Sequence, residues 1–264
     1  MSVPELASVD GRIVPTAEAT IPLADDGLYR GDGVFEVIRL YGGHPYALAE
    51  HLDRLERSAA TIELEVEREP LEREIAALLE RFGSGDAQLR LVVTRGGRRI
   101  AATEELPDKG ETVRLATVTY APTIILNGVK SLSYGANMQA TRTAQGRGAD
   151  EALLVRPDGI VLEAPTSTIF WTSPEGGLRT PSLGAGILES ITRARIVREL
   201  HVEEAEYHVD DLHAAHEAFL ASTVREVQPV AEIDGRALAS PGPRTAEARA
   251  AFEAVIARAL ATSA

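Results

Sequence analysis

The sequence of 264 residues contains no cysteine, which excludes disulfide bonds and thiolate metal sites. It has no apolar stretch long enough to span a bilayer, and no basic segment followed by an apolar run opens the chain. Basic residues are outnumbered by acidic ones, and the formal net charge of -13 is opposite in sign to that expected of a general nucleic-acid binder. We therefore expect a cytoplasmic protein that binds neither nucleic acid nor membranes.

Lysine is also scarce, because only Lys109 and Lys130 occur among 27 basic residues. Lys109 lies in "EELPDKGET", a polar stretch with proline and glycine that predicts a surface loop. Lys130 lies between apolar and small residues in "NGVKSLSYGAN". In a partly dry pocket, the pKa of a lysine can fall from ~10.4 to roughly 7–8, so that the amine acts as nucleophile or base, whereas arginine stays protonated. A surface lysine with a packed aliphatic stem is the alternative interpretation.

Helix-like and strand-like segments are both present. Apolar residues recur at helical spacing in residues 48–62, and a second helical segment, residues 69–83, ends at a glycine. A further helix is expected from Lys130 to about Gln145. Because regular βαβ units are missing, the pattern predicts an α+β fold in two domains rather than a doubly wound sheet. The expected parts are an N-terminal α/β domain at 1–120, a linker at 121–126 and a C-terminal domain at 127–264.

Two further residues could assist an amine such as that of Lys130. If the segment is helical, Tyr134 lies one turn away on the same face, where its phenol could hydrogen-bond an oxygen of a bound carbonyl compound. Glu163 ends a strand-like run in "GIVLEAPTSTIFW" and precedes three hydroxyl residues. Its carboxylate could pair with a protonated ring nitrogen, although solvated polar residues at a strand end would explain the pattern equally well.

Several segments could bind an anion. Ile191 and Thr192 lie near the start of an expected helix, where main-chain N–H groups lack acceptors. Thr223 lies at the end of an expected strand, and Arg54 flanks the apolar stripe of its helix, where it could reach a phosphate or remain in solvent. Two histidines in "DLHAAHEAF" have a metal-like spacing, but no H-E-x-x-H pattern and no clear third ligand accompany them, so we expect no metal.

In this order along the chain, these segments resemble the class IV aminotransferases, the fold-type IV pyridoxal 5'-phosphate (PLP) enzymes. The resemblance covers about Leu28 to about Gly235 and rests on "GLYRGDGVFEVIR", "EHLDRLERSA", "VTRGG", "VKSLSYGANM", "GADEALLV", "DGIVLEAPTSTIF", "GILESITR" and "FLASTVREVQPV". The family includes branched-chain and D-amino acid aminotransferases, (R)-amine transaminases and 4-amino-4-deoxychorismate lyases. The resemblance implies a small N-terminal domain, a larger C-terminal PLP-binding domain and a homodimer.

The resemblance also implies a role for individual residues. Lys130 matches the lysine that forms the Schiff base with PLP and shuttles the proton, and Glu163 matches the carboxylate that keeps the pyridine nitrogen protonated. Tyr134 is similar to the tyrosine near the phenolic oxygen of the cofactor. The residues that match the phosphate-binding set are Arg54, Ile191, Thr192 and Thr223.

The sequence departs from the family pattern on the substrate side. The family often has E-G-x-x-S-N where this chain has "EAPTST", and the arginine-x-histidine carboxylate trap of D-amino acid aminotransferases is missing from "RGGRRIAAT". Paired guanidinium groups suit a carboxylate, so Arg30 and Arg90 could take over that role. The alternative interpretations are a residue of a surface turn for Arg30 and an ion pair on the face of a strand for Arg90. The expected substrate-binding residues are Arg30, Phe35, Arg90 and Val224.

These features predict an enzyme, a PLP-dependent aminotransferase that moves an amino group between a small amino acid and a 2-oxo acid by a ping-pong mechanism. The two arginines and the short chain favour D-amino acids, and L-branched-chain donors remain open. A 4-amino-4-deoxychorismate lyase, which eliminates pyruvate to give p-aminobenzoate, is the alternative. A PLP-binding protein without catalysis is a third interpretation, against which the presence of Lys130, Glu163 and Tyr134 argues.

Overall fold

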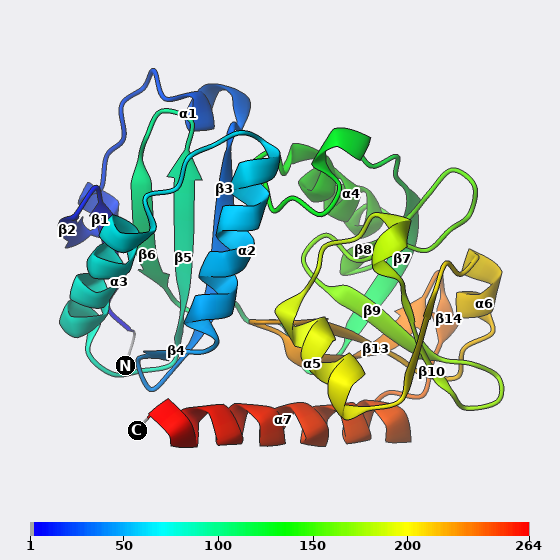
Figure 1. Cartoon of the computed structure of the whole chain (residues 1–264). Coiled ribbons are helices and arrows are strands. Elements are labelled where there is room, and N and C mark those ends of the chain that lie inside the picture. Colours follow the sequence, from blue (N-terminus) through cyan, green and yellow to red (C-terminus); the bar gives the residue numbers. More distant parts are fainter. Residues whose placement is uncertain (1–2, 264) are drawn as a thin grey trace. The chain divides into compact units, whose positions relative to one another are not determined.

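The computed structural model describes residues 3–263, which form two compact units (Figure 1). The first unit comprises the described residues of Met1–Pro107, Val129–Tyr134 and Ala259–Ala264, and the second comprises Asp108–Gly128 and Gly135–Arg258. The chain thus leaves the first unit at Pro107 and returns to it for the short segment that contains Lys130. The domain boundary expected at residue 120 lies later in the chain than this first exit.

The first unit is built on an antiparallel sheet of six strands in the order β2-β1-β6-β5-β3-β4. Its tight first hairpin turns at Asp10 and Gly11, whose φ values of 50° and 86° lie in the left-handed region that such turns require. The strands are β1 (Leu6–Val9), β2 (Arg12–Pro15), β3 (Gly33–Tyr41), β4 (His44–Pro45), β5 (Ala87–Thr94) and β6 (Arg99–Glu104).

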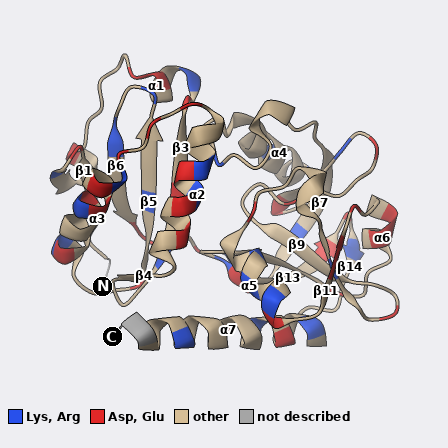
Figure 2. Ribbon diagram, viewed as in Figure 1, with Lys and Arg blue, Asp and Glu red and all other residues tan. Residues whose placement is uncertain are grey.

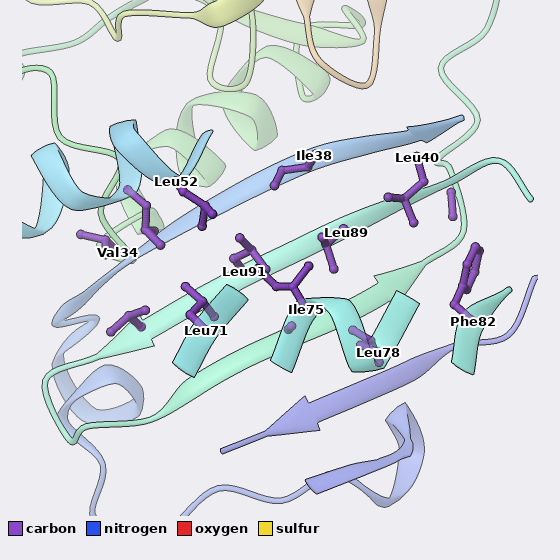
Figure 3. Packing of buried hydrophobic residues seen from close by; sticks show 14 of the residues in the cluster. Val34, Ile38, Leu40, Leu52, Leu71, Ile75, Leu78, Phe82, Leu89 and Leu91 are labelled. Carbon is purple, nitrogen blue, oxygen red and sulfur yellow. The ribbon is translucent and has the colours of Figure 1, made fainter. Parts of the chain in front are cut away.

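Helices α2 (Leu48–Thr61) and α3 (Arg68–Phe82) cover one face of this sheet, as the helical spacing of their apolar residues predicts. Figure 3 shows the resulting core, in which Leu71 and Ile75 of α3 meet Leu91 of β5. Charged residues occupy the remaining surface of both helices (Figure 2). The short elements α1 (Asp26–Arg30) and η1 (Thr16–Glu18) lie in the segment that precedes β3.

The second unit contains a mixed sheet of eight strands. Its order is β11-β10-β9-β12-β13-β7-β8, with β14 paired to β13. Its strands are β7 (Val113–Thr119), β8 (Glu151–Val155), β9 (Thr168–Thr172), β10 (Leu178–Pro181), β11 (Val202–Ala205), β12 (Ala218–Ser222), β13 (Glu226–Ile233) and β14 (Arg236–Ala237). Its helices are η2 (Ile124–Leu126), α4 (Gly135–Gln145), η3 (Leu183–Ala185), α5 (Ile191–Glu199) and α6 (Val209–His213), and α7 (Pro243–Ser263) closes the chain.

Strand β7 explains where the chain changes unit. It pairs in parallel with β8 on one side and with β13 on the other, so residues 113–119 belong to the second sheet.

The core of this unit includes Trp171, the only tryptophan, which is fully buried and meets Tyr207 edge to face at 5.1 Å. None of the helices within residues 3–263 is long and apolar enough to cross a membrane.

Candidate active site

Lys130 lies in an extended segment of the first unit, so the helix expected from Lys130 to about Gln145 is present with the expected end but starts five residues later, at Gly135. The Lys130 carbonyl accepts a hydrogen bond from the Phe35 N–H at 3.0 Å, and Ser131 forms a bridge with Val34. The Lys130 N–H donates to Ser58 Oγ at 3.1 Å. Pairing with β3 therefore fixes the main chain of Lys130, and the helix α4 begins only at Gly135.

Phe35 connects the side chains of Lys130 and Tyr134. The Lys130 Nζ atom lies 4.3 Å from the centre of the Phe35 ring, a cation–π contact. The Tyr134 ring meets the same Phe35 ring edge to face, with 5.4 Å between centroids. The expected proximity of Lys130 and Tyr134 was based on helical spacing, whereas in the structure both side chains contact Phe35.

Arg54 forms a buried ion pair with Glu36. Its Nε and Nη2 atoms donate to the two carboxylate oxygens of Glu36, both at 2.7 Å, and its side chain is 6% exposed. The Nδ1 atom of His51 lies 2.8 Å from the Glu36 Oε2 atom. A guanidinium has five N–H donors, and the pair with Glu36 uses two of them. The structure thus holds the expected phosphate ligand Arg54 in a fixed orientation.

Burial and the neighbouring charges set the protonation states of Glu36 and His51. Burial would raise the pKa of Glu36, but Arg54 and His51 outweigh burial and lower this pKa to about 2. Burial lowers the pKa of His51, and the positive charges of Arg54 and Lys130 act in the same direction, against the opposing effect of Glu36. At neutral pH, an ionised Glu36 accepts hydrogen bonds only, so the Nδ1 atom of a neutral His51 carries the proton.

The two arginines expected to bind a substrate carboxylate are each paired with an acidic residue of the first unit. Arg30, in the last turn of α1, pairs with Asp26, and its side chain is 69% exposed. Arg90, on β5, donates to both carboxylate oxygens of Glu104, at 2.6 and 2.9 Å. Both arrangements agree with the alternative interpretations, a surface turn and a strand-face ion pair. A joint carboxylate role for Arg30 and Arg90 stays a prediction.

In the second unit, a main-chain N–H group orients the carboxylate of Glu163. The Oε1 atom of Glu163 accepts a hydrogen bond from the Leu188 N–H at 3.0 Å. The main chain of Glu163 is held as well, because its carbonyl accepts from the Leu154 N–H of β8 at 3.0 Å. Glu163 is therefore tied both to the sheet and to the segment that leads into α5.

The N-terminus of α5 presents main-chain donors. Ser190 caps the helix, and its Oγ atom accepts from the Arg193 N–H at 3.2 Å. The preceding helical residues, Ile191 and Thr192, are both buried, and N–H groups of a first helical turn have no acceptor within the helix. The structure thus confirms that these two residues begin a helix, which is the geometry of an anion site.

Thr223 and Val224 lie in the short connection between β12 and β13. The strands pair directly up to Ser222 and Glu226, so the connection is a tight hairpin loop. Glu226 adopts a φ of 55°, in the left-handed region. The backbone of these two expected site residues is therefore confined to a narrow turn.

Sequence reasoning missed Glu36, His51 and the N–H of Leu188. A signal for Glu36 exists, because it is the single acidic residue within the apolar strand "GVFEVIRLY" and is fully buried. A lone carboxylate in a buried strand requires a basic partner. His51 and Arg54 stand three residues apart on α2, on the helix face that supplies this partner. The Leu188 N–H has no sequence signal, because any residue except proline provides one.

The family model described as amino-transferase class IV matches residues 33–233. The chain belongs to the class IV aminotransferase family. Enzymes of this family use PLP. The match spans the β3 strand, Lys130, Glu163 and the β12–β13 loop, and it confirms the resemblance found in the sequence.

Similar class IV aminotransferases come from several organisms. The chain is 35% identical to a putative branched-chain-amino-acid aminotransferase of Methanocaldococcus jannaschii, over 87% of this chain and 88% of the relative. It is 32% identical to a D-alanine aminotransferase of Bacillus licheniformis, over 92% and 94%. An aminodeoxychorismate lyase of Bacillus subtilis is 30% identical, over 86% of each chain.

A solved structure of this family has the same fold. The branched-chain aminotransferase of Thermoproteus uzoniensis with norvaline superposes with a TM-score of 0.85 at 31% identity, covering 95% of this chain and 94% of that chain. The expected α+β fold, with the architecture of fold-type IV enzymes, is thereby confirmed.

Proposed function

We propose that this chain is a PLP-dependent transaminase that transfers an amino group between a small amino acid and a 2-oxo acid. The observation that carries the proposal is the setting of Lys130. Its N–H and C=O groups are both held within the first unit, and its amine lies over the ring of Phe35. A fixed main chain and a flat apolar contact leave the amine in one small region, as a covalent attachment point requires.

The chain offers the types of chemical group that suit PLP. Lys130 supplies the amine that would hold the cofactor, and Glu163 supplies a carboxylate whose Oε1 atom is oriented by the Leu188 N–H. A phosphate suits the first-turn N–H groups of α5 and a guanidinium such as that of Arg54. We assign phosphate binding to Arg54, Ile191, Thr192 and Thr223.

When bound, PLP supplies an electron sink that stabilises negative charge at the α-carbon of an amino acid. Within this scheme, Lys130 Nζ would take the proton from the α-carbon of the amino acid and deliver it to the C4′ carbon of the cofactor, so that the amino group stays with the cofactor and a 2-oxo acid leaves. Glu163 would keep the pyridine nitrogen of the cofactor protonated, since an anionic carboxylate favours the charged form of a neighbouring base. The phenol of Tyr134 would donate a hydrogen bond to the phenolic oxygen of the cofactor, and the Phe35 ring covers one side of the Lys130 amine.

The donor amino acid is the finer part of the proposal. We assign its contacts to Phe35 and Val224, and its carboxylate to Arg30 and Arg90. Each of these arginines already has an acidic partner, so a carboxylate role requires exchange of Asp26 or Glu104 for the substrate. The proposal therefore covers D-amino acids, which the sequence favours, and L-branched-chain amino acids, which the relative of Methanocaldococcus jannaschii supports.

The second candidate function is that of a 4-amino-4-deoxychorismate lyase. It is supported by the lyase of Bacillus subtilis, which is 30% identical. Such an enzyme would use the same Lys130 and Glu163 but release pyruvate and p-aminobenzoate from one substrate, with no amino acceptor. Release of p-aminobenzoate from 4-amino-4-deoxychorismate distinguishes it from a transaminase.

The homodimer implied by the family is a separate prediction, which sedimentation of the purified protein tests.

Chemical trapping tests the role of Lys130. The PLP-loaded protein is reduced with borohydride, digested and analysed by mass spectrometry. The proposal predicts a pyridoxyl group on Lys130 and none on Lys109, which serves as an internal control because it is the only other lysine. The variant Lys130→Ala should fold but carry no label. A label on Lys109, or an unchanged label in Lys130→Ala, would refute the assignment.

A further inference from the structure

Arg225 holds the end of the β12–β13 loop. The loop comprises Thr223, Val224 and Arg225, between the last residue of β12 and the first residue of β13. The Arg225 N–H donates to the Oγ atom of Ser222 at 3.3 Å. Thr223 and Val224 thus lie between two residues that are bonded to each other.

The side chain of Arg225 is buried among polar partners. It is 3% exposed, and its Nη2 atom donates to the Glu151 Oε2 atom at 2.5 Å. Its Nη1 atom donates to the side-chain oxygen of Gln228. The Gln228 amide nitrogen in turn donates to the carbonyl oxygens of Lys109 and Gly110, at 2.5 and 3.1 Å. Two different partners therefore fix the plane of the guanidinium.

Glu151 connects this loop to the turn that follows Glu163. Its Oε1 atom accepts a hydrogen bond from the Thr166 Oγ1 atom at 3.3 Å, while its Oε2 atom accepts from Arg225. Thr166 lies in a turn closed by two main-chain hydrogen bonds between Ala164 and Ser167. One carboxylate at the start of β8 therefore contacts both segments.

These contacts suit a positioning role better than direct binding. The charge of Arg225 is already balanced by Glu151, and both of its terminal nitrogens have protein acceptors. Desolvation offsets much of the attraction in a buried ion pair, so such a pair adds little net stability. Its hydrogen bonds are nevertheless directional and short, which fixes the geometry of the loop that they anchor.

We propose that Arg225 and Glu151 are positioning residues that hold the Thr223–Val224 loop in the conformation that binds the phosphate of PLP. This inference rests on the proposed function, because it assigns the phosphate contact to Thr223. It predicts that loosening the pair weakens binding of a phosphorylated ligand and leaves binding of the unphosphorylated ligand unchanged.

The test compares PLP with pyridoxal, which lacks the phosphate. Full-length apo protein is titrated with each ligand, and binding is followed by visible absorption and by the fluorescence of Trp171, the only tryptophan. The variants are Arg225→Ala and the double variant Glu151→Gln/Arg225→Met. The double variant removes both charges at once and leaves no unpaired buried charge, so it should fold even if Arg225→Ala fails to fold.

The matched control is the neighbouring pair Arg114–Asp150. Its Nη2–Oδ1 distance is 2.7 Å, but its side chains are 51% and 45% exposed. The control double variant Arg114→Met/Asp150→Asn should bind PLP within about twofold of the wild type, because exposed pairs contribute little.

The proposal predicts that the Glu151→Gln/Arg225→Met variant binds PLP about tenfold more weakly, the size of effect seen between residues of one hydrogen-bond network. Its affinity for pyridoxal should stay within about twofold of the wild type. Unchanged affinity for both ligands would overturn the proposal, and so would an equal loss for both, which indicates a general structural defect. Failure of the wild-type protein to bind PLP would instead overturn the proposed function itself, and this inference with it.

Discussion

The buried pair between Glu36 and Arg54 gives a quantitative prediction. Replacing Glu36 with glutamine keeps the shape of the side chain but removes its negative charge. Arg54 cannot lose its proton, so the variant Glu36→Gln leaves a guanidinium that is 6% exposed without its ionised partner. His51 loses a charged acceptor at the same time.

The magnitude follows from two independent arguments. The pKa of Glu36 is lowered from 4.5 to about 2, and at about 1.4 kcal/mol per pKa unit this shift corresponds to roughly 3 kcal/mol in favour of the ionised form. Removal of one partner from a buried ion pair typically costs about 3–5 kcal/mol. We therefore expect the free energy of unfolding to fall by about 3 kcal/mol.

Urea unfolding of the cofactor-free protein at pH 7, followed by far-UV circular dichroism, measures this loss. The control is Glu69→Gln, the same substitution in the same unit. Glu69 lies 3.9 Å from Arg73, with side chains 88% and 71% exposed, and should change the free energy of unfolding by no more than about 0.5 kcal/mol. A loss in Glu36→Gln as small as that in Glu69→Gln would refute the description of Glu36 and Arg54 as a buried charge pair.

Three further predictions concern stability. The pKa of Glu36 is lower in the folded than in the unfolded chain, so the stability that Glu36 contributes is complete above pH 4.5 and is lost as the pH falls towards 2. Acid titration followed by circular dichroism should therefore show less destabilisation in Glu36→Gln than in the wild type, and an equal response would contradict this. Gly159→Ala would place a Cβ atom 2.0 Å from the His208 Nε2 atom, at a residue whose φ is 85°, so the free energy of unfolding in urea should fall by about 2 kcal/mol. Adding His208→Ala should restore only part of this loss, and full restoration would exclude a contribution of backbone strain. Ser190→Ala removes the acceptor of the Arg193 N–H and should cost about 1 kcal/mol in the same assay, and no loss would mean that the cap is replaced by water.

Local patterns predicted the elements of the first unit well. The helical spacing of residues 48–62 and the glycine at the end of residues 69–83 correspond to α2 and α3. In each case the signal lies within one element, as a repeat of 3.6 residues or as a glycine that ends a helix.

Contacts between distant segments were not predictable in the same way. The helix expected from Lys130 to about Gln145 is present only from Gly135, because the edge of β3 offers main-chain partners to residues 130–132 and holds them extended. Similarly, β7 joins the second sheet because β8 and β13 pair with it. A single sequence carries no local signal for either partner.

The candidate site shows both kinds of outcome. The family pattern predicted roles for Lys130 and Glu163, and the structure shows which groups hold them: Ser58 and Phe35 for Lys130, and the Leu188 N–H for Glu163. The partners of Arg90 and Arg225 could not be read from the sequence, since Glu104 and Glu151 are two among many acidic residues. The roles of the substrate-binding residues stay predictions.

A single half-reaction tests the proposed transaminase activity most directly. PLP-loaded protein is mixed with D-alanine or, separately, with L-leucine, without any 2-oxo acid, and the visible absorption of the bound cofactor and the released 2-oxo acid are measured. We expect loss of the visible band with at least one donor, together with release of one equivalent of the matching 2-oxo acid, pyruvate from D-alanine or 4-methyl-2-oxopentanoate from L-leucine. The same experiment on Lys130→Ala should show no turnover. An unchanged band and no 2-oxo acid with either donor would contradict the transaminase assignment and favour the lyase.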